Sequence, residues 1–485
     1  MINISFQLKY ARPMVVFGVL AAFVPGVVEA TPVDPEIMAR FKQVPPAEKR
    51  PAAVRNKRLV ERGRQLFMNE TFDGNGRTCA SCHPPTNNFT IDPAFIATLP
   101  DDDPLFVAEF NPDLAELEHP ELMRRFGLIL ENLDGFDRPG VFRGVPHTLG
   151  LGVSIAVNPD GDDNLTRADG STVVHATGWS GDGAPGDGAL RSFAIGAIVQ
   201  HLPKTLNREP GEDFRLPTEA ELDALEAFQL SLGRQTEIDL ATLNFADENV
   251  QAGKDLFEGI GTNRACSSCH NNAGANNADG FNRNFATNVV NLTDTEARRF
   301  HPEMPGDGGF GSEPEYEVEK IAAEFYGNGT MNSASLVEAA DTGPFFHNNS
   351  AKTIEDAVRF YTKATFSGDN PFQLDAPQIN RVAAFLRALN ALENIRNGNA
   401  LAKQAQRQPP PRARGTIALV IADTRDAIEV LSSGPLDLYP DAVALLDEAL
   451  ELELDARETV PPPFRNPLLR QAEALKNDAR EIILD

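Results

Sequence analysis

Residues 79–83 read Cys79-Ala80-Ser81-Cys82-His83, and residues 266–270 repeat the pattern as Cys266-Ser267-Ser268-Cys269-His270. These two stretches contain all 4 cysteines of the chain. The spacing Cys-x-x-Cys-His is typical of c-type haem attachment, in which both thiols join the porphyrin and the adjacent histidine ligates the iron. The sequence therefore predicts two covalently bound haem c groups. They would be held by Cys79, Cys82, His83, Cys266, Cys269 and His270.

Two other kinds of site also use cysteine pairs at this spacing. Each pair could form a short disulfide, or the four thiols together could form a zinc ribbon. A zinc ribbon does not require a histidine directly after each second cysteine. It also favours pairs much closer in sequence than Cys79 and Cys266. The motif therefore favours haem.

The N-terminus has the features of a secretory signal peptide. Lys9 and Arg12 precede an apolar run from Met14 to Val24, and Val28-Glu29-Ala30 offers small residues for cleavage after Ala30. The run is too short to be a membrane anchor, and no later segment is long and apolar enough to span a bilayer. Since bacteria attach c-type haem outside the cytoplasm, we expect the mature protein in the periplasm.

The composition is strongly acidic, with 44 Lys and Arg against 70 Asp and Glu and a net charge of −26. This balance argues against nucleic-acid binding, because affinity for phosphates depends on cationic side chains. It is typical of a soluble protein, and it would equally attract a basic electron-donor protein over a long range.

An internal repeat indicates a duplicated architecture. The pattern Gly-x-x-Leu-Phe precedes each haem motif, at 63–67 and at 253–257. Residues 221–233 and 378–392 also resemble each other, and both contain Ala-Phe. We therefore expect a mainly α fold in which each half runs from a helix through the haem motif and long loops to a closing helix.

This organisation predicts the division of the chain. The expected parts are a signal peptide at 1–30, an N-terminal arm rich in proline and alanine at 31–52, cytochrome c-like helical domains at 53–235 and 236–398, and a linker with a helical extension at 399–485.

Within these parts, residues 53–68 carry apolar residues at helical spacing. The long Gly-, Asp- and Pro-rich loops at 84–190 and 271–335 are expected to fold over the cofactors. In the extension we expect a proline-containing linker from Gln406 to Gly415 and helices at about 416–433, 440–455 and 464–482. The extension lacks cysteine and histidine, which favours a role in packing or partner contact.

Several further segments are similar to the bacterial diheme cytochrome c peroxidase family, which includes the MauG-type diheme enzymes. These segments are Gly74-Asn75-Gly76, Arg143 to Leu149, Gly178 to Gly181, Thr342 to His347 and Thr353 to Tyr361. The resemblance covers roughly 53–398. It implies a peroxidatic haem in the N-terminal domain, an electron-transfer haem in the C-terminal domain, and electrons from a small cytochrome c or cupredoxin. Hydrogen peroxide would be the substrate.

The resemblance also implies roles for two aromatic residues. Trp179, the 1 tryptophan of the chain, matches the family's tryptophan between the haems and is assigned to electron relay, although a core role is the simpler alternative. Tyr361 falls where the peroxidases have a methionine ligand of the C-terminal haem and MauG-type enzymes have tyrosine. Tyrosinate is an established axial ligand. Met331 and Met304 are rival ligands, and Tyr361 could instead be a core residue of an amphipathic helix.

The proton donor and calcium site depart from the family pattern. The family's distal glutamate is missing from 198–204, so His201 would shuttle the proton and Gln200 would position a water. His201 could instead be a packing histidine. Thr342 and Pro344 match two residues whose backbone carbonyls bind calcium in the family. Gly150 replaces the family's asparagine ligand, so calcium is left open. Other candidates are His147 and His175 as distal ligands and His347 as a residue that supports the C-terminal haem.

Four functions remain compatible with the sequence. The first is a peroxidase. The second is a MauG-type oxidase acting on a partner protein, and the third is a diheme oxygenase resembling the rubber-cleaving enzymes. The fourth is a non-catalytic electron-transfer cytochrome with two six-coordinate haems. A homodimer is left open as the assembly.

Overall fold

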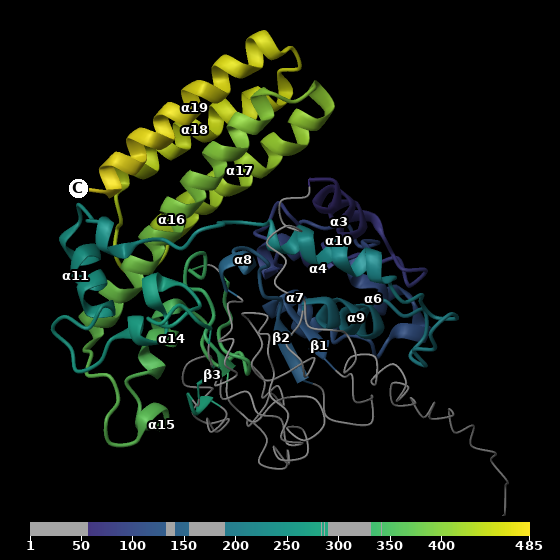
Figure 1. Ribbon diagram of the computed structural model, residues 1–485, viewed down its shortest axis with the longest axis horizontal. Coiled ribbons are helices and arrows are strands. Elements are labelled where there is room, and N and C mark those ends of the chain that lie inside the picture. The colour runs from purple at the N-terminus through teal and green to yellow at the C-terminus, as the bar shows by residue number, and fades with distance from the viewer. Residues whose placement is uncertain are drawn as a thin grey trace, which may run out of the picture.

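Figure 1 shows the computed structural model, which describes residues 57–131, 141–154, 190–282, 284–285, 287–289, 331–340 and 342–485. The described chain is mainly helical, with two short antiparallel strand pairs. This confirms the expected fold class. The expected signal peptide and N-terminal arm lie outside the described residues. No helix within the described ranges is long and apolar enough to cross a membrane.

In the first half, helices α3 and α10 pack together. The segment from 84 to 154, expected to be a long loop, contains short helices and a strand pair in its described part. The helices and strands of the first half are α3 (Lys57–Asn69), α4 (Cys79–Cys82), α5 (Pro93–Ile96), α6 (Val107–Phe110), α7 (Pro120–Phe126), β1 (Leu128–Glu131), β2 (Val141–Gly144), α8 (Leu151–Ser154), α9 (Leu190–His201) and α10 (Glu219–Leu230).

The second half pairs α11 with α16 in the same way. Its elements are α11 (Glu248–Phe257), the 3₁₀ turns η4 (Cys266–Ser268) and η5 (Asn271–Ala273), β3 (Asn284–Phe285), β4 (Met331–Asn332), α14 (Ile354–Phe360), α15 (Ala364–Ser367) and α16 (Ala376–Gln406). The extension adds α17 (Pro410–Ser432), α18 (Pro440–Glu458) and α19 (Pro462–Ile483). In Figure 1 these three helices and α16 form a bundle that projects from the α11 side of the molecule.

A glycine contact recurs in both halves. Gly63 of α3 lies so close to α10 that a Cβ on it would stand 1.9 Å from the carbonyl oxygen of Ala224. Gly253 of α11 lies equally close to α16, where a Cβ would stand 1.9 Å from the carbonyl oxygen of Arg381. Any side chain would force the two helices of a pair apart. The repeated Gly-x-x-Leu-Phe therefore encodes a close helix crossing.

A phenylalanine pair accompanies each crossing. The rings of Phe67 and Phe228 lie 5.2 Å apart between centroids, and those of Phe257 and Phe385 lie 5.3 Å apart. Phe228 and Phe385 belong to the two Ala-Phe dipeptides of the internal repeat. The helix pairs and aromatic pairs thus show that the internal repeat is structural. The division into domains and their cytochrome c-like character stay predictions.

The extension is continuous with the second half. Helix α16 runs through the expected boundary at 398 without a break, and α17 already begins at Pro410. The linker expected from Gln406 to Gly415 is therefore wrong in its extent. Proline at the first positions of a helix needs no amide donor and favours helix initiation, so the run of prolines starts a helix here. The three helices predicted beyond it are present.

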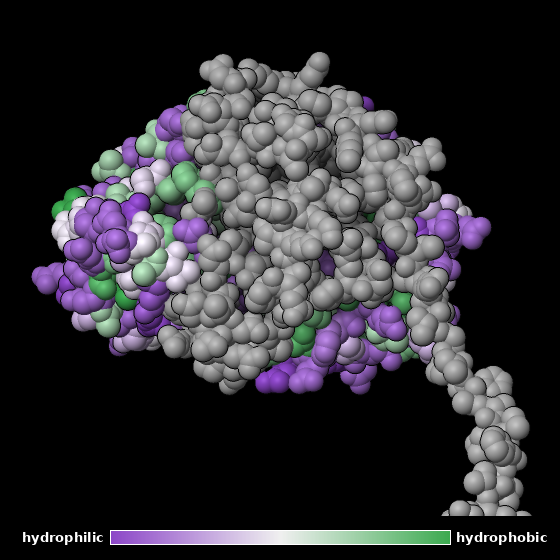
Figure 2. All heavy atoms as spheres, turned by 90° about the horizontal axis from the view of Figure 1, so that it is seen from below, coloured by the Kyte–Doolittle hydropathy of each residue, from purple (hydrophilic) through white to green (hydrophobic). Residues whose placement is uncertain are grey.

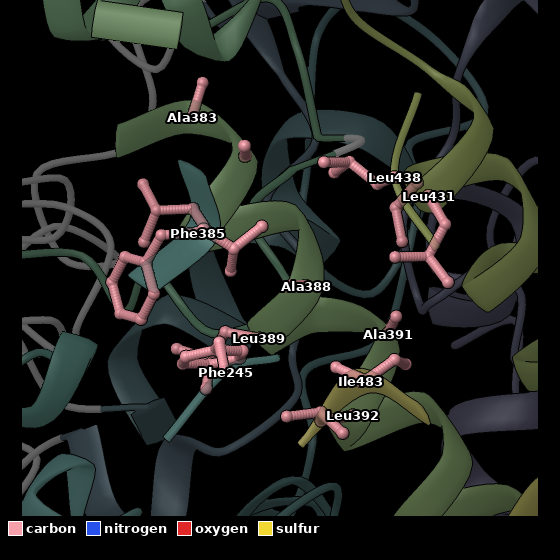
Figure 3. Packing of buried hydrophobic residues seen from close by; sticks show 14 of the residues in the cluster. Phe245, Ala383, Phe385, Ala388, Leu389, Ala391, Leu392, Leu431, Leu438 and Ile483 are labelled. Atoms are coloured by element: carbon pink, nitrogen blue, oxygen red, sulfur yellow. The ribbon is translucent and has the colours of Figure 1, made fainter. Parts of the chain in front are cut away.

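The end of the chain packs into the second half's core. The amide of Ala246 donates to the carbonyl of Ile483 at 3.1 Å, and the amide of Asp485 donates to that of Asn244 at 3.0 Å. Figure 3 shows Ile483 beside Ala391 and Leu392 of α16. The extension thus contributes to the same apolar core as α11 and α16. On the face shown in Figure 2, the described residues on the left are a mixture of hydrophilic and hydrophobic, and those on the right are mainly hydrophilic.

We predict that Gly63→Ala and Gly253→Ala destabilise the fold, each by about 1–3 kcal/mol, because the new methyl overlaps a backbone carbonyl. Gly415→Ala is the matched control, since a Cβ there meets nothing within 4 Å. It should be neutral or stabilising by up to about 1 kcal/mol, because alanine is the better helix former. Urea unfolding of the three variants measures this, and an equal effect at all three positions would contradict the close crossings.

We also predict that Ile483→Ala costs about 2–5 kcal/mol, because it leaves a cavity in the core that α16 shares with the extension. Ile260, which is 62% exposed, provides the control, and Ile260→Ala should change the free energy of unfolding by less than about 0.5 kcal/mol. Guanidinium unfolding would show this. A separate early transition for the bundle, with the rest of the chain unaffected by Ile483→Ala, would show that the extension folds as an independent part.

Candidate functional site

Both cysteine-histidine motifs form a single helical turn. In the first, α4 spans the two cysteines, and the amide of His83 donates to the carbonyl of Cys79 at 2.9 Å. In the second, the amide of His270 donates to the carbonyl of Cys266 at 3.0 Å. All four cysteines are free thiols in the structure, so neither pair forms a disulfide. In the described part of the chain, no group of three or more His, Cys, Asp or Glu side chains is arranged to hold a metal ion.

Each motif histidine is oriented by a backbone carbonyl. The Nδ1 atom of His83 lies 2.8 Å from the carbonyl oxygen of Phe89, and that of His270 lies 2.9 Å from the carbonyl oxygen of Ala334. A carbonyl oxygen only accepts, so Nδ1 carries the proton and Nε2 keeps the lone pair that binds a metal. Burial lowers the pKa of His83 to about 4 and also lowers the pKa of His270. Both rings are therefore neutral at physiological pH.

The donor set fits haem c at both motifs. Burial raises the pKa of Cys79 and of Cys266 to about 12 and that of Cys82 to about 11, so these thiols are uncharged. Neutral thiols beside a neutral imidazole suit an apolar porphyrin that is held by thioether bonds. The first motif also borders an aromatic cluster, since the Phe67 ring lies 6.0 Å from the His83 ring.

Tyr361 lies near the second motif. Burial raises the pKa of its phenol, and the thiols of Cys266 and Cys269 are close enough to raise it further. The ring also packs in an aromatic cluster, with its centroid 4.9 Å from that of Phe366. Both predicted roles, axial ligand and core aromatic, therefore remain compatible with its position. The rival Met331 contributes to strand β4, which pairs with β3.

A buried carboxylate lies beside His201, although residues 198–204 themselves contain none. Glu118, between η2 (Pro112–Leu114) and α7, places Oε1 3.6 Å from Nδ1 of His201. This separation is too long for a hydrogen bond. The same carboxylate accepts from Arg77 Nη1 at 2.7 Å and from the amide of Leu130 at 2.8 Å. Sequence reasoning missed Glu118 because only the folded chain brings it to the end of α9.

The charge of Glu118 is balanced by its neighbours. Burial alone would raise its pKa, but the Arg77 guanidinium and then the His201 ring hold the pKa below its ordinary value. The carboxylate is therefore ionised at neutral pH. His201 in turn lowers the pKa of His83, after the larger effect of burial, so this charged cluster lies close to the first motif.

Gln200 has a different partner from the water that we expected. Its amide nitrogen lies 3.2 Å from the carbonyl oxygen of Leu130 and 3.2 Å from Nε2 of His201. Because an amide nitrogen only donates, Nε2 of His201 accepts in this arrangement and Nδ1 carries the proton. The Nδ1–H therefore points toward Glu118. Gln200 positions His201, and its described contacts leave the predicted water untested.

The other candidate histidines occupy distinct places. His147 is buried, and its Nδ1 accepts from the amide of Leu149 at 3.2 Å. Burial lowers the pKa of His147 to about 3, and the charges of Arg234 and His83 lower it further. His147 is therefore neutral. His347 is half-buried in the loop of residues 342–350. Trp179, His175 and Met304 lie outside the described residues, so their roles stay predictions.

The surroundings of Gly150 do not favour calcium, whereas the carbonyls of Thr342 and Pro344 are not tested. Gly150 has no side-chain oxygen, and a Cβ on it would lie 2.8 Å from Nη1 of Arg234. A fixed positive charge therefore lies where the family's asparagine ligand is expected. Thr342 donates its hydroxyl to the carbonyl of Ala339 at 3.1 Å. Calcium stays an untested prediction that these contacts do not favour.

Comparisons with known proteins do not assign the chain to a family. No protein-family model and no curated protein matches it. Among solved structures, it is similar to hydrazine synthase from Kuenenia stuttgartiensis, at 15% sequence identity over 78% of this chain and 99% of that chain, with a TM-score of 0.31. A TM-score this low carries no argument about fold or function.

We predict that Arg77→Met destabilises the fold by about 3–5 kcal/mol at pH 7, because it leaves the Glu118 carboxylate buried without its cation. The ion pair stabilises the fold fully above the carboxyl's unfolded pKa of about 4.3. Its contribution is lost as the pH falls below that value through the lower folded pKa, so Glu118→Gln should weaken the acid dependence of stability.

The control for this pair is Arg125→Met. Its partner Glu121 lies 3.0 Å away, but both side chains are more than half exposed, so the change should be below about 1 kcal/mol. Urea unfolding between pH 3 and 7 compares the variants. A stability loss for Arg77→Met no larger than that for Arg125→Met would contradict the buried pair.

Proposed function

We propose that the chain is a periplasmic diheme c-type cytochrome peroxidase, which reduces hydrogen peroxide with electrons from a small redox protein. The observation that carries this proposal is the contact of His201 with the buried Glu118 carboxylate beside the first motif. It supplies a proton-handling group near one of two sites that both fit haem c. The reaction takes two protons and two electrons and converts hydrogen peroxide to two water molecules. When bound, haem supplies the redox chemistry that breaks the O–O bond.

The residues at the first site support proton transfer. The Gln200 amide holds Nε2 of His201 as an acceptor, and the Nδ1–H faces the ionised Glu118. The carboxylate stabilises the imidazolium that forms when Nε2 takes a proton, as an orienting carboxylate does in other acid–base pairs. Such a group typically contributes about 10²–10⁴-fold to a rate. His201 therefore takes the role that the missing glutamate has in the family.

Electron supply follows from charge and from the second site. The net charge of −26 favours a basic donor, such as a cytochrome c or a cupredoxin. In this proposal the site at Cys266 to His270 receives the electron and passes it to the first site, with Trp179 as the relay. Export of the chain places both steps in the periplasm.

A MauG-type oxidase is the second candidate, and the position of Tyr361 favours it. This phenol is half-buried, and the nearby thiols of Cys266 and Cys269 raise its pKa after the larger effect of burial. A tyrosinate ligand stabilises ferric iron, which suits storage of oxidising equivalents better than fast electron uptake. Such an enzyme would oxidise a partner protein in place of a small electron donor.

The proposal is tested on protein matured in a host that attaches haem c. We expect a high-spin ferric signal by electron paramagnetic resonance, and peroxide consumption coupled to oxidation of reduced cytochrome c. His201→Gln and Glu118→Gln should lower kcat, the former by about 10²–10⁴-fold, with the haem content unchanged. Glu121→Gln is the matched control for Glu118→Gln, because the Glu121 carboxylate is exposed.

Three outcomes would contradict the peroxidase. Two low-spin haems with no turnover would indicate an electron-transfer cytochrome. A spectrum changed by peroxide, with no oxidation of the donor protein, would favour the MauG-type reaction. Full activity in both His201→Gln and Glu118→Gln would remove the assigned proton shuttle.

A further inference from the structure

Arg234 joins the two halves of the molecule. It follows α10, where the amide of Gly150 donates to the carbonyl of Leu232 at 3.1 Å. Gly233 has φ +66°, and a Cβ on it would lie 2.6 Å from the nitrogen of Gly150. These two glycines bring the first half's segments together closely enough to hold the Arg234 guanidinium against Gly150. From there its Nη2 donates to the hydroxyl of Ser335 in the second half at 2.8 Å.

The guanidinium is buried and only partly satisfied. Arg234 is 2% exposed, and the Glu237 Oε2 lies 3.8 Å from its Nη2. The buried Glu338 carboxyl is also nearby, since burial raises its pKa and the Arg234 charge opposes that rise. Nε and Nη1 have no hydrogen-bond partner among the described residues. Leaving a buried donor unsatisfied is costly, and more so when the donor is charged. Such an arrangement is expected where a bound group supplies the acceptors.

The contacts of Arg234 lead toward both motif histidines. Ser335 directly follows Ala334, whose carbonyl accepts from His270 at 2.9 Å. On the other side, His147 is buried, and the charges of Arg234 and His83 both lower its pKa after the larger effect of burial. The open donors therefore lie near segments that lead to both candidate haem sites, and the hydrogen bond to Ser335 connects Arg234 to the segment that orients His270.

The chemistry of the missing acceptor follows from the donor. Guanidinium binds carboxylates with high geometric preference, and such charge-assisted bonds are about twice as strong as neutral ones. A haem carries two propionate carboxylates on one edge of its ring. We propose that Arg234 binds a propionate of the haem at Cys266 to His270 through Nε and Nη1, and that it thereby raises the reduction potential of that haem. This inference rests on the proposed function, because it requires the second haem.

The expected direction follows from charge. With Arg234 in place, the propionate is neutralised and ferrous iron is favoured. Without Arg234, a buried negative charge remains and favours ferric iron. Arg234→Met should therefore lower the potential of one haem by at least a tenfold change in its ferrous-to-ferric equilibrium, which is about 59 mV. Arg234→Lys, which keeps the charge and loses the fork, should lower it by less.

Spectroelectrochemical titration of the intact protein measures both potentials. Ser335→Ala removes the hydrogen bond to Nη2 and keeps the cation, so its potentials should stay close to wild type. Arg465→Met is the matched control for loss of a buried arginine, because Arg465 is 2% exposed in the extension and donates to the carbonyl of Ala405. Haem content and circular dichroism of each variant are recorded first.

The outcomes separate this inference from the proposed function. Wild-type protein without two covalent haems would refute the proposed function itself. Two haems whose potentials both shift by less than about 59 mV in Arg234→Met would refute only the role of Arg234. A saturable spectral change on adding acetate or phosphate to wild type, absent in Arg234→Met, would mean that a free anion occupies the donors, and would overturn the propionate assignment.

Discussion

The hydrogen bond from histidine Nδ1 to a backbone carbonyl is the interaction on which the account of both sites depends. It fixes the tautomer, so that Nε2 is the atom left to bind iron. Its acceptor comes from nearby sequence in the first half, at Phe89, and from a distant segment in the second half, at Ala334. The second site therefore exists only when residues 331–340 fold back onto the motif. Orientation of a ligand by a second group is what a stable metal site requires.

Close helix crossings hold these motifs in place. Gly63 and Gly253 let α3 and α11 approach α10 and α16 to backbone contact, and an aromatic pair completes each crossing. Each motif turn comes one short segment after its helix, since α3 ends at Asn69 before Cys79 and α11 ends at Phe257 before Cys266. The second half differs because α16 is extended and the chain's end returns to it at Ile483. That half therefore has a larger core.

Local patterns in the sequence predict much of this structure, and long-range contacts explain what they miss. The cysteine spacing, the glycine repeat and the apolar periodicity act within a few residues, so they give the motifs, the duplicated helices and the extension helices. The prolines at 409–411 are ambiguous, because the same residues end one helix or begin the next. Glu118 and Arg234 carry no local signal at all. Their roles depend on partners far away in the sequence, which only the folded chain brings together. Glu118 meets His201 at the end of α9, and Arg234 meets Ser335 in the second half.

The central claim is that each cysteine pair carries a covalently bound haem. Intact-mass spectrometry of the denatured mature protein, matured in a host that attaches haem c, tests this most directly, since thioether bonds survive denaturation. The account predicts a mass equal to the polypeptide plus two haem groups, with one group lost when Cys79 and Cys82 are both replaced by alanine and the other retained. A mass equal to the bare polypeptide would contradict it.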